Sequence, residues 1–164
     1  SSRRRHTRLL TVTGVQTCAL PILKAKGVDY REVQKIELKV HPLVLELTGK
    51  KTPRTGLEGK FSIYYGAALG LVFGRASEHE YDDNIVNRPD VIAIRDKVIA
   101  QIDPNMSEAS VEASAYLMNG QKISIRVEHA IGSLQNPMSD QALEDKFSYL
   151  CEPIIGAKIG RAHV

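Results

Sequence analysis

The stretch TGLEGKFSIYYGAALGLVFG, which runs from Thr55 to Gly74, decides which fold the sequence predicts. It opens with Thr55-x-x-Glu58, a capping-box pattern in which the threonine side chain accepts from a first-turn amide and the glutamate reaches back. Gly74 ends the run, as a glycine often does at a helix C-terminus. Beyond its first turn the segment is apolar on nearly all sides, so it predicts one long buried helix near residues 56–74.

The polar side chains of this segment recur at helical spacing. Glu58, Ser62 and Tyr65 share one stripe, and Lys60 lies to one side of it. The basic loop from Gly49 to Arg54 comes just before. Free amides and the helix dipole favour an anionic ligand at such a helix start. The alternative is a core helix with a polar first turn, which periodicity alone favours.

The two ends of the chain are predicted not to be native sequence. VTGVQTCALPI, from Val12 to Ile22, and IGRAHV, from Ile159 to Val164, are encoded by the two strands of one oligonucleotide, which resembles a common sequencing adapter. A basic mitochondrial-type leader is the alternative for the N-terminal end, but it leaves the matching C-terminus unexplained. We therefore expect residues 1–22 and 159–164 to be adapter-derived and to pack little against residues 23–158, an incomplete part of a longer protein.

Excluding the flanks changes what the composition indicates. The chain has 22 basic and 19 acidic residues, a net charge of +3; the flanks hold five arginines and no acid, so 17 basic residues remain and the net charge becomes −2. The excess of positive charge that would indicate a nucleic-acid-binding protein is therefore absent. Cys151 becomes the lone cysteine, which fits a reducing compartment. No charge-free apolar run is long enough to predict a membrane span.

The remaining sequence predicts an α+β domain. Alternating residues indicate strands at 35–40, 109–118 and 122–127, and Asn119-Gly120 predicts a hairpin with a type I′ turn. Short helices are expected at 77–86, where Ser77-x-x-Glu80 is a second capping box, and at 89–97, and residues 98–102 can form a further strand. A last helix is expected from Asp140 to Leu150. The architecture is a two-layer domain with a small, mainly antiparallel sheet covered by helices.

Residues with catalytic potential are sparse. His41, His79 and His129 lie far apart and lack the short spacings of metal ligands, so structural or surface roles are favoured. Cys151 has no base nearby in the sequence. There is no P-loop, no G-x-G-x-x-G and no G-x-S-x-G. From the residues alone, the function is limited to a possible anion site beside Lys60, Ser62 and Tyr65.

Two blocks of sequence resemble the C-terminal part of the MmgE/PrpD family. They are HPLVLELTGKKTPRTGLEGKFSIYYGAALGLVFGRA, from His41 to Ala76, and NPMSDQALEDKF, from Asn136 to Phe147. The KFS of Lys60 to Ser62, with a tyrosine three residues later, is the most specific mark. The family includes 2-methylcitrate dehydratases, cis-aconitate decarboxylases and an iminodisuccinate epimerase.

The resemblance implies a cytoplasmic, homodimeric lyase or isomerase that acts on small di- or tricarboxylates without a metal or an organic cofactor. Its members combine a large helical domain with a smaller α+β lid, and this chain resembles the lid. By resemblance, Tyr65 is a catalytic tyrosine that reaches the substrate, and Lys60 and Ser62 bind substrate. The acid–base residues of the family lie in the missing N-terminal helical domain, so the fragment alone is expected to be inactive. The alternative is a non-catalytic small-anion-binding or regulatory α+β module.

Overall fold

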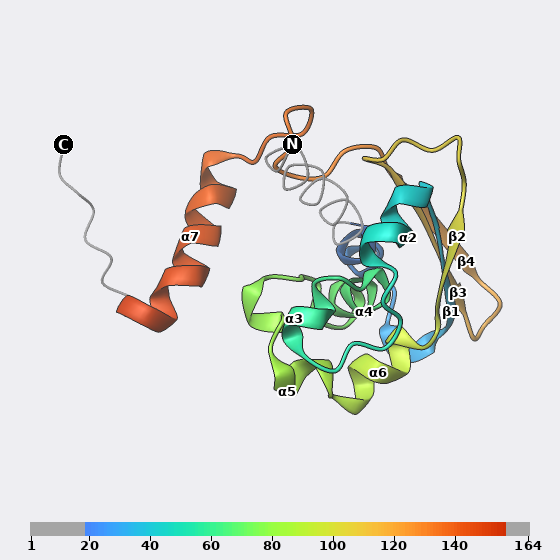
Figure 1. The fold of residues 1–164 in the computed structure, drawn as a ribbon, viewed down its shortest axis with the longest axis horizontal. Coiled ribbons are helices and arrows are strands. Elements are labelled where there is room, and N and C mark those ends of the chain that lie inside the picture. The colour runs from blue at the N-terminus through green and yellow to red at the C-terminus, as the bar shows by residue number, and fades with distance from the viewer. Residues whose placement is uncertain (1–18, 157–164) are drawn as a thin grey trace. The chain divides into compact units, whose positions relative to one another are not determined.

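The computed structural model describes residues 19–156 (Figure 1). These residues form two compact units, one extending to Ile131 and the other beginning at Gly132. Of the residues that the structure describes, none belongs to a helix long and apolar enough to cross a membrane.

The first unit contains a four-stranded sheet with the order β2-β1-β3-β4. The strands are β1 (Val33–Val40), β2 (Val98–Ile102), β3 (Val111–Leu117) and β4 (Lys122–Val127). β3 pairs with β4 in antiparallel fashion, as expected of the hairpin. β1 also pairs with β3 in antiparallel fashion, but β2 runs parallel to β1. The sheet is therefore mixed, because the chain returns to β2 through the helices that follow β1, and such a crossover brings the new strand back in the same direction.

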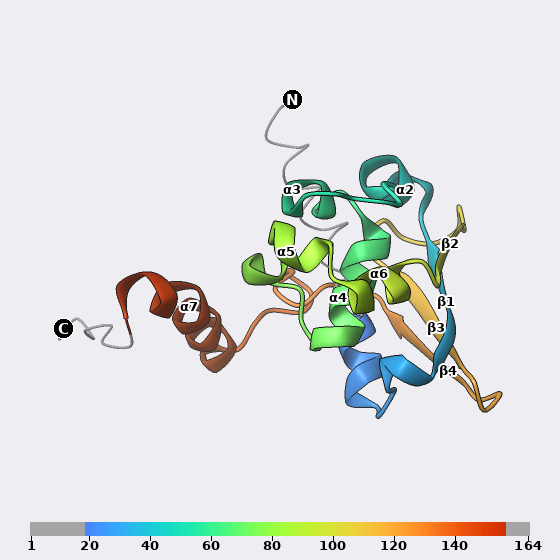
Figure 2. The same ribbon diagram turned by 90° about the horizontal axis from the view of Figure 1, so that it is seen from below.

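Helices cover one face of this sheet, and Figure 2 shows them together on one side of the strands. They are α2 (Pro42–Thr48), α3 (Gly56–Gly59), α4 (Ile63–Phe73), α5 (Asp83–Val86) and α6 (Pro89–Arg95). Two short 3-10 helices are also present: η1 (Tyr30–Glu32) comes just before β1, and η2 (Glu78–Glu80) lies between α4 and α5. The α+β two-layer architecture expected from the sequence is confirmed.

The expected single helix over residues 56–74 is broken into α3 and α4. Ser62 adopts an extended backbone (φ −126°, ψ 106°), and its side chain accepts from the Tyr65 amide, so it begins a new helix. Gly59 also lets the Tyr65 ring pack closely against the backbone of α3, because a Cβ at Gly59 would lie 2.7 Å from that ring. The capping serine thus interrupts an otherwise continuous apolar run. Gly74 ends α4 in the left-handed conformation, as expected.

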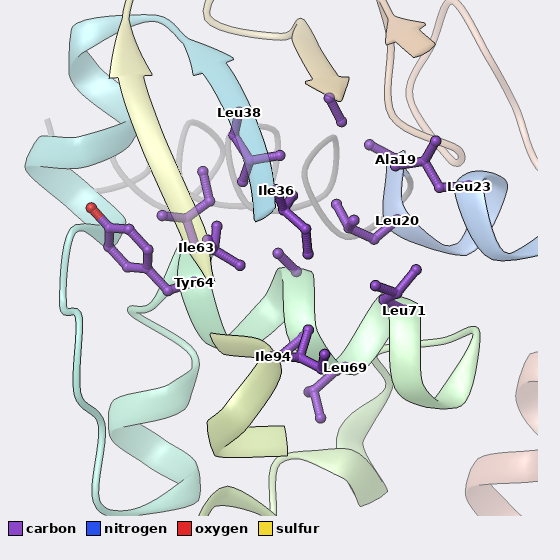
Figure 3. Packing of buried hydrophobic residues seen from close by; sticks show 14 of the residues in the cluster. Ala19, Leu20, Leu23, Ile36, Leu38, Ile63, Tyr64, Leu69, Leu71 and Ile94 are labelled. Carbon is purple, nitrogen blue, oxygen red and sulfur yellow. The ribbon is translucent and has the colours of Figure 1, made fainter. Parts of the chain in front are cut away.

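The core lies between α4 and the sheet (Figure 3). Ten of the eleven residues of α4 are buried, and they pack against Ile36 and Leu38 of β1 and Ile94 of α6. α4 is apolar all round, and such a helix is stable only when surrounded by other elements. It is therefore the centre of the domain.

Residues 19–25 form a helix that completes this core. Ala19, Leu20 and Leu23 are fully buried, and Figure 3 shows them beside Leu71 of α4. A Cβ at Gly70 would lie 2.7 Å from Pro21 Cδ and 2.8 Å from Leu20 Cβ, so the two helices are in close contact.

The expectation that the flanks pack little against the domain is therefore wrong for residues 19–22. The buried side chains of Ala19 and Leu20 pack against α4, and burial of a large side chain such as that of Leu20 is worth about 1.5–3 kcal/mol whatever DNA encodes it. Residues 1–18 and 159–164 lie outside the described residues. The adapter origin itself stays a prediction, which sequencing of the locus from genomic DNA tests.

The β3–β4 hairpin is present, but its turn differs from the expected type. The Gly120 amide donates to the Leu117 carbonyl, and the Leu117 amide donates to the Gln121 carbonyl. Gly120 has a φ of +82°, whereas no non-glycine residue in the described part of the chain has a positive φ. Asn119 therefore cannot occupy a type I′ position, and the loop is a three-residue turn whose last residue is left-handed.

We expect Gly120→Val to lower the free energy of unfolding by about 1 kcal/mol, because a β-branched residue resists a positive φ. A Cβ at this position would meet no other atom within 4 Å, so the effect reports the backbone alone. Gly120→Asn is the matched control, since asparagine tolerates this conformation better. Thermal unfolding measures the stability of both variants. Equal melting temperatures for the valine variant and the parent would contradict the left-handed conformation assigned to Gly120.

The second unit contains α7 (Asp140–Ile155). Ser139 caps it as expected, its side chain accepting from the Ala142 amide at 3.2 Å. The helix extends beyond the expected end at Leu150, so Cys151 lies within α7 rather than after it, as a free, partly exposed thiol.

Candidate functional site

Ser62 has a structural role that the sequence pattern did not reveal. It is 4% exposed, and its Oγ accepts from the Tyr65 amide at 3.1 Å at the first turn of α4. The side chain is therefore engaged with the helix start itself. The structure brings Ser62 and Tyr65 together through this backbone contact.

Replacing Ser62 by alanine is expected to cost about 1 kcal/mol of folding free energy, the usual effect of removing a helix cap. Ser62→Gly should cost only a few tenths of a kcal/mol, because glycine is tolerated at this position. Chemical denaturation of the two variants measures the difference. If alanine proved as stable as serine, the capping role would have to be abandoned.

Tyr65 is fully buried in the first unit. Its hydroxyl donates to the Glu80 carbonyl at 2.6 Å, and its ring meets that of Tyr81 edge-on, with centroids 5.6 Å apart. Burial raises the pKa of the Tyr65 hydroxyl strongly, so it stays protonated at neutral pH. Tyr65 thus joins α4 to the η2 segment, as a core residue whose hydroxyl is hydrogen-bonded. The catalytic role implied by the resemblance stays a prediction.

Lys60 lies on the surface between α3 and α4. Its Nζ forms an ion pair with Glu78 Oε1 at 2.7 Å, and its side chain is 42% exposed. The ammonium group therefore points to η2 while remaining accessible to water. An exposed pair of this kind exchanges partners at small cost, so Lys60 keeps the capacity to bind an anion.

The η2 segment is held by a buried carboxylate. Glu80 is 4% exposed, and it accepts from the Ser77 amide, from Ser77 Oγ at 2.6 Å and from Arg75 Nε at 2.8 Å. The second capping box expected at Ser77-x-x-Glu80 is confirmed. Because Glu80 also supplies the carbonyl that binds the Tyr65 hydroxyl, this box fixes the surroundings of Tyr65.

The basic loop before α3 is partly neutralised. Glu58 accepts from Lys50 Nζ at 2.7 Å and from the Arg54 amide at 2.7 Å, and these contacts, with Lys50 first, lower the pKa of its carboxyl. The Thr55 side chain accepts from the Glu58 amide, as expected, although the carboxylate reaches Arg54 rather than Thr55. Lys50 is therefore occupied, while its neighbour Lys51 makes no ion pair with any described residue.

Sequence reasoning missed a cleft of about 330 Å³ at the edge of the sheet. It is lined by Lys51, Tyr64, Arg95, Asp96 and residues 98–100 of β2, among others. The one available signal was Lys51 in the basic loop. Tyr64 lines this cleft, whereas the Tyr65 hydroxyl contacts η2. Which tyrosine reaches which neighbour depends on where the neighbouring elements lie.

The histidines do not converge. His41 caps α2, its Nδ1 accepting from the Leu43 amide at 3.2 Å, which confirms a structural role. His79 and His129 each interact with other residues. No three histidine, cysteine or acidic side chains gather as metal ligands within residues 19–156.

The chain belongs to the MmgE/PrpD family: the family profile described as the MmgE/PrpD C-terminal domain matches residues 14–162. The curated relatives include the 2-methylcitrate dehydratases of Salmonella typhimurium (strain LT2) and Escherichia coli (strain K12). Each is 26% identical over 83 residues, which cover 50% of this chain and 17% of the relative. The match thus spans about a sixth of the length of these proteins.

Proposed function

We propose that this chain is the C-terminal, substrate-covering part of a cofactor-independent hydro-lyase that acts on a small di- or tricarboxylate, in the manner of a 2-methylcitrate dehydratase. The observation that carries the proposal is the match of the MmgE/PrpD C-terminal domain to nearly the whole chain. Two curated relatives named 2-methylcitrate dehydratase add the reaction class.

In the proposed reaction, a base removes a proton from a carbon next to a carboxylate. The electron pair of that bond forms a carbon–carbon double bond, and the neighbouring hydroxyl leaves as water after gaining a proton. Such a step needs a positioned base, an acid and donors that stabilise the developing charge. The described residues supply donors and cations, so the base is assigned to the N-terminal helical domain of the full-length protein, and the chain alone is inactive.

Within this proposal, Tyr65 donates to the substrate and Lys60 pairs with a substrate carboxylate. The hydroxyl of Tyr65 would have to leave the Glu80 carbonyl, which it contacts at 2.6 Å. Lys60 would exchange Glu78 for substrate. Ser62 binds substrate in the same proposal: its Oγ accepts from the Tyr65 amide, and its own hydroxyl proton remains available to donate to a carboxylate. A homodimer of the full-length protein is part of the same proposal.

The test begins with the gene upstream of Leu23. A helical domain there, followed by loss of water from 2-methylcitrate by the full-length protein, would support the hydro-lyase. Ultraviolet absorbance of the new double bond measures the reaction, and the 164-residue chain alone serves as the control. An unrelated upstream domain, with no turnover of di- or tricarboxylates, would favour the non-catalytic anion-binding module.

A further inference from the structure

The cleft at the open edge of the sheet has the composition of a binding site. It lies where β2, the end of α6, the first turn of α4 and the basic loop meet. Its volume of about 330 Å³ is at the lower end of the range for small-molecule sites. None of the three candidate residues Lys60, Ser62 and Tyr65 lines it.

Tyr64 provides an uncommitted hydroxyl in this cleft. Figure 3 shows its ring directed away from the other labelled core residues, with the hydroxyl oxygen at the far end. The hydroxyl makes no hydrogen bond to any described residue, and no buried side-chain oxygen in the described part of the chain lacks a partner. The hydroxyl must therefore be open to solvent. Burial of the ring raises the pKa of Tyr64, so the group is a donor at neutral pH.

Two cations and one carboxylate line the same cleft. Lys51 is exposed and forms no ion pair within the part of the chain that the structure describes. The Arg95 side chain is 10% exposed, and its Nε and Nη2 donate to Asp96 Oδ1 at 2.9 and 2.8 Å. A guanidinium has five donors, so Arg95 retains others. The formal charge of the lining is +1.

The edge strand adds further donors. The Lys97 carbonyl accepts from the Ile36 amide at 3.0 Å, so the backbone carbonyl of Lys97 points to β1. Because residues alternate along a strand, the backbone groups of Val98 and Ala100 point to the open edge, where no described strand pairs with them. The side chains of Val98, Ile99 and Ala100 give this wall an apolar character.

We propose that this cleft binds a small organic carboxylate, separately from the site around Tyr65. Lys51 supplies the counter-charge, and the Tyr64 hydroxyl and the remaining Arg95 donors hydrogen-bond the carboxylate oxygens. The apolar wall of β2 packs against the carbon skeleton, which favours an organic acid over inorganic phosphate. Asp96, which pairs with Arg95, lowers the formal charge of the lining to +1 and so moderates the attraction for an anion.

The proposal is tested by titrating the 164-residue protein with succinate at constant ionic strength, using calorimetry and backbone amide chemical shifts. We expect saturable binding, with the Val98 and Ala100 amides among those that shift. Lys51→Met and Tyr64→Phe should each weaken binding about tenfold, the effect of losing one hydrogen bond to a charged group. Inorganic phosphate should bind more weakly than succinate.

Lys50→Met is the matched control, because it removes the same charge one residue away, outside the cleft. It should leave succinate binding within about twofold, and Lys51→Arg should retain binding. Circular dichroism confirms that each variant is folded. The proposal is overturned if Lys50→Met weakens binding as much as Lys51→Met, or if the shifts gather at Lys60 and Tyr65 instead. The absence of saturable binding by the parent protein would overturn it as well.

Discussion

Leu20→Ala is expected to lower the free energy of unfolding by about 2–5 kcal/mol, the usual cost of truncating a buried leucine. Leu20 belongs to the helix of residues 19–25, and its side chain is fully buried. Gly70 of α4 lets the backbones of these two helices approach closely. The replacement leaves a cavity in the core beside α4. Chemical denaturation of the 164-residue protein measures the loss.

Ile22→Ala is the control on the same helix, because Ile22 is 36% exposed and a surface change should stay within about 0.5 kcal/mol. Gly70→Ala gives a second measurement. The sign of its effect on the free energy of unfolding shows whether residues 19–22 pack against α4. With residues 19–22 packed as described, the new Cβ would be 2.7 Å from Pro21 Cδ and would destabilise the protein by about 1–3 kcal/mol. Without that packing, alanine would stabilise α4 by about 1 kcal/mol.

Local patterns in the sequence predicted most of the elements. β4 occupies residues 122–127 as expected, and the capping residues Ser77 and Ser139 act where the pattern indicated. These features depend on residues within four positions of one another, such as a serine and the amide three residues later. Alternation along β3 likewise identified its buried face.

The errors arose where distant or competing contacts decide the structure. Ser62 lies inside an apolar run, so its capping role was hidden and α3 and α4 were expected to be one helix. The pairing of β2 with β1 joins Val98 to Ile36 across the intervening helices, and no local pattern reports its direction. The burial of Leu20 depends on its close contact with α4 at Gly70, which only the assembled fold creates.

The candidate site shows the same limit at the level of single side chains. Successive residues of a helix point in directions about 100° apart, so Tyr64 and Tyr65 cannot face the same neighbour. The spacing of Glu58, Ser62 and Tyr65 indicated a polar stripe, but not that η2 covers the Tyr65 hydroxyl while Tyr64 reaches the cleft. The location of η2 follows from the Arg75–Glu80 pair and the capping box, which a helical-stripe argument does not include.

Tyr65→Phe is expected to reduce stability by about 1–3 kcal/mol, because the Glu80 carbonyl loses its donor in a buried setting. Tyr64→Phe makes the same chemical change one residue earlier and should stay within about 0.5 kcal/mol, since the Tyr64 hydroxyl has no partner among the described residues. Thermal unfolding of both variants compares them directly. Equal losses would show that the Tyr65 hydroxyl is not specially engaged.

In the full-length protein, the proposed substrate role makes a further prediction for Tyr65→Phe. If the hydroxyl binds charge that develops in the transition state, turnover should fall at least tenfold, since about 1.4 kcal/mol of lost stabilisation corresponds to a factor of ten. Gly120→Val is the stability-matched control, because the hairpin tip carries none of the candidate residues and should lower melting without changing turnover. Assays run well below both melting transitions separate the two effects. A Tyr65→Phe enzyme that melts earlier but turns over normally would leave the tyrosine as the residue that joins α4 to η2, and the proposed donor to the substrate would have to be sought elsewhere.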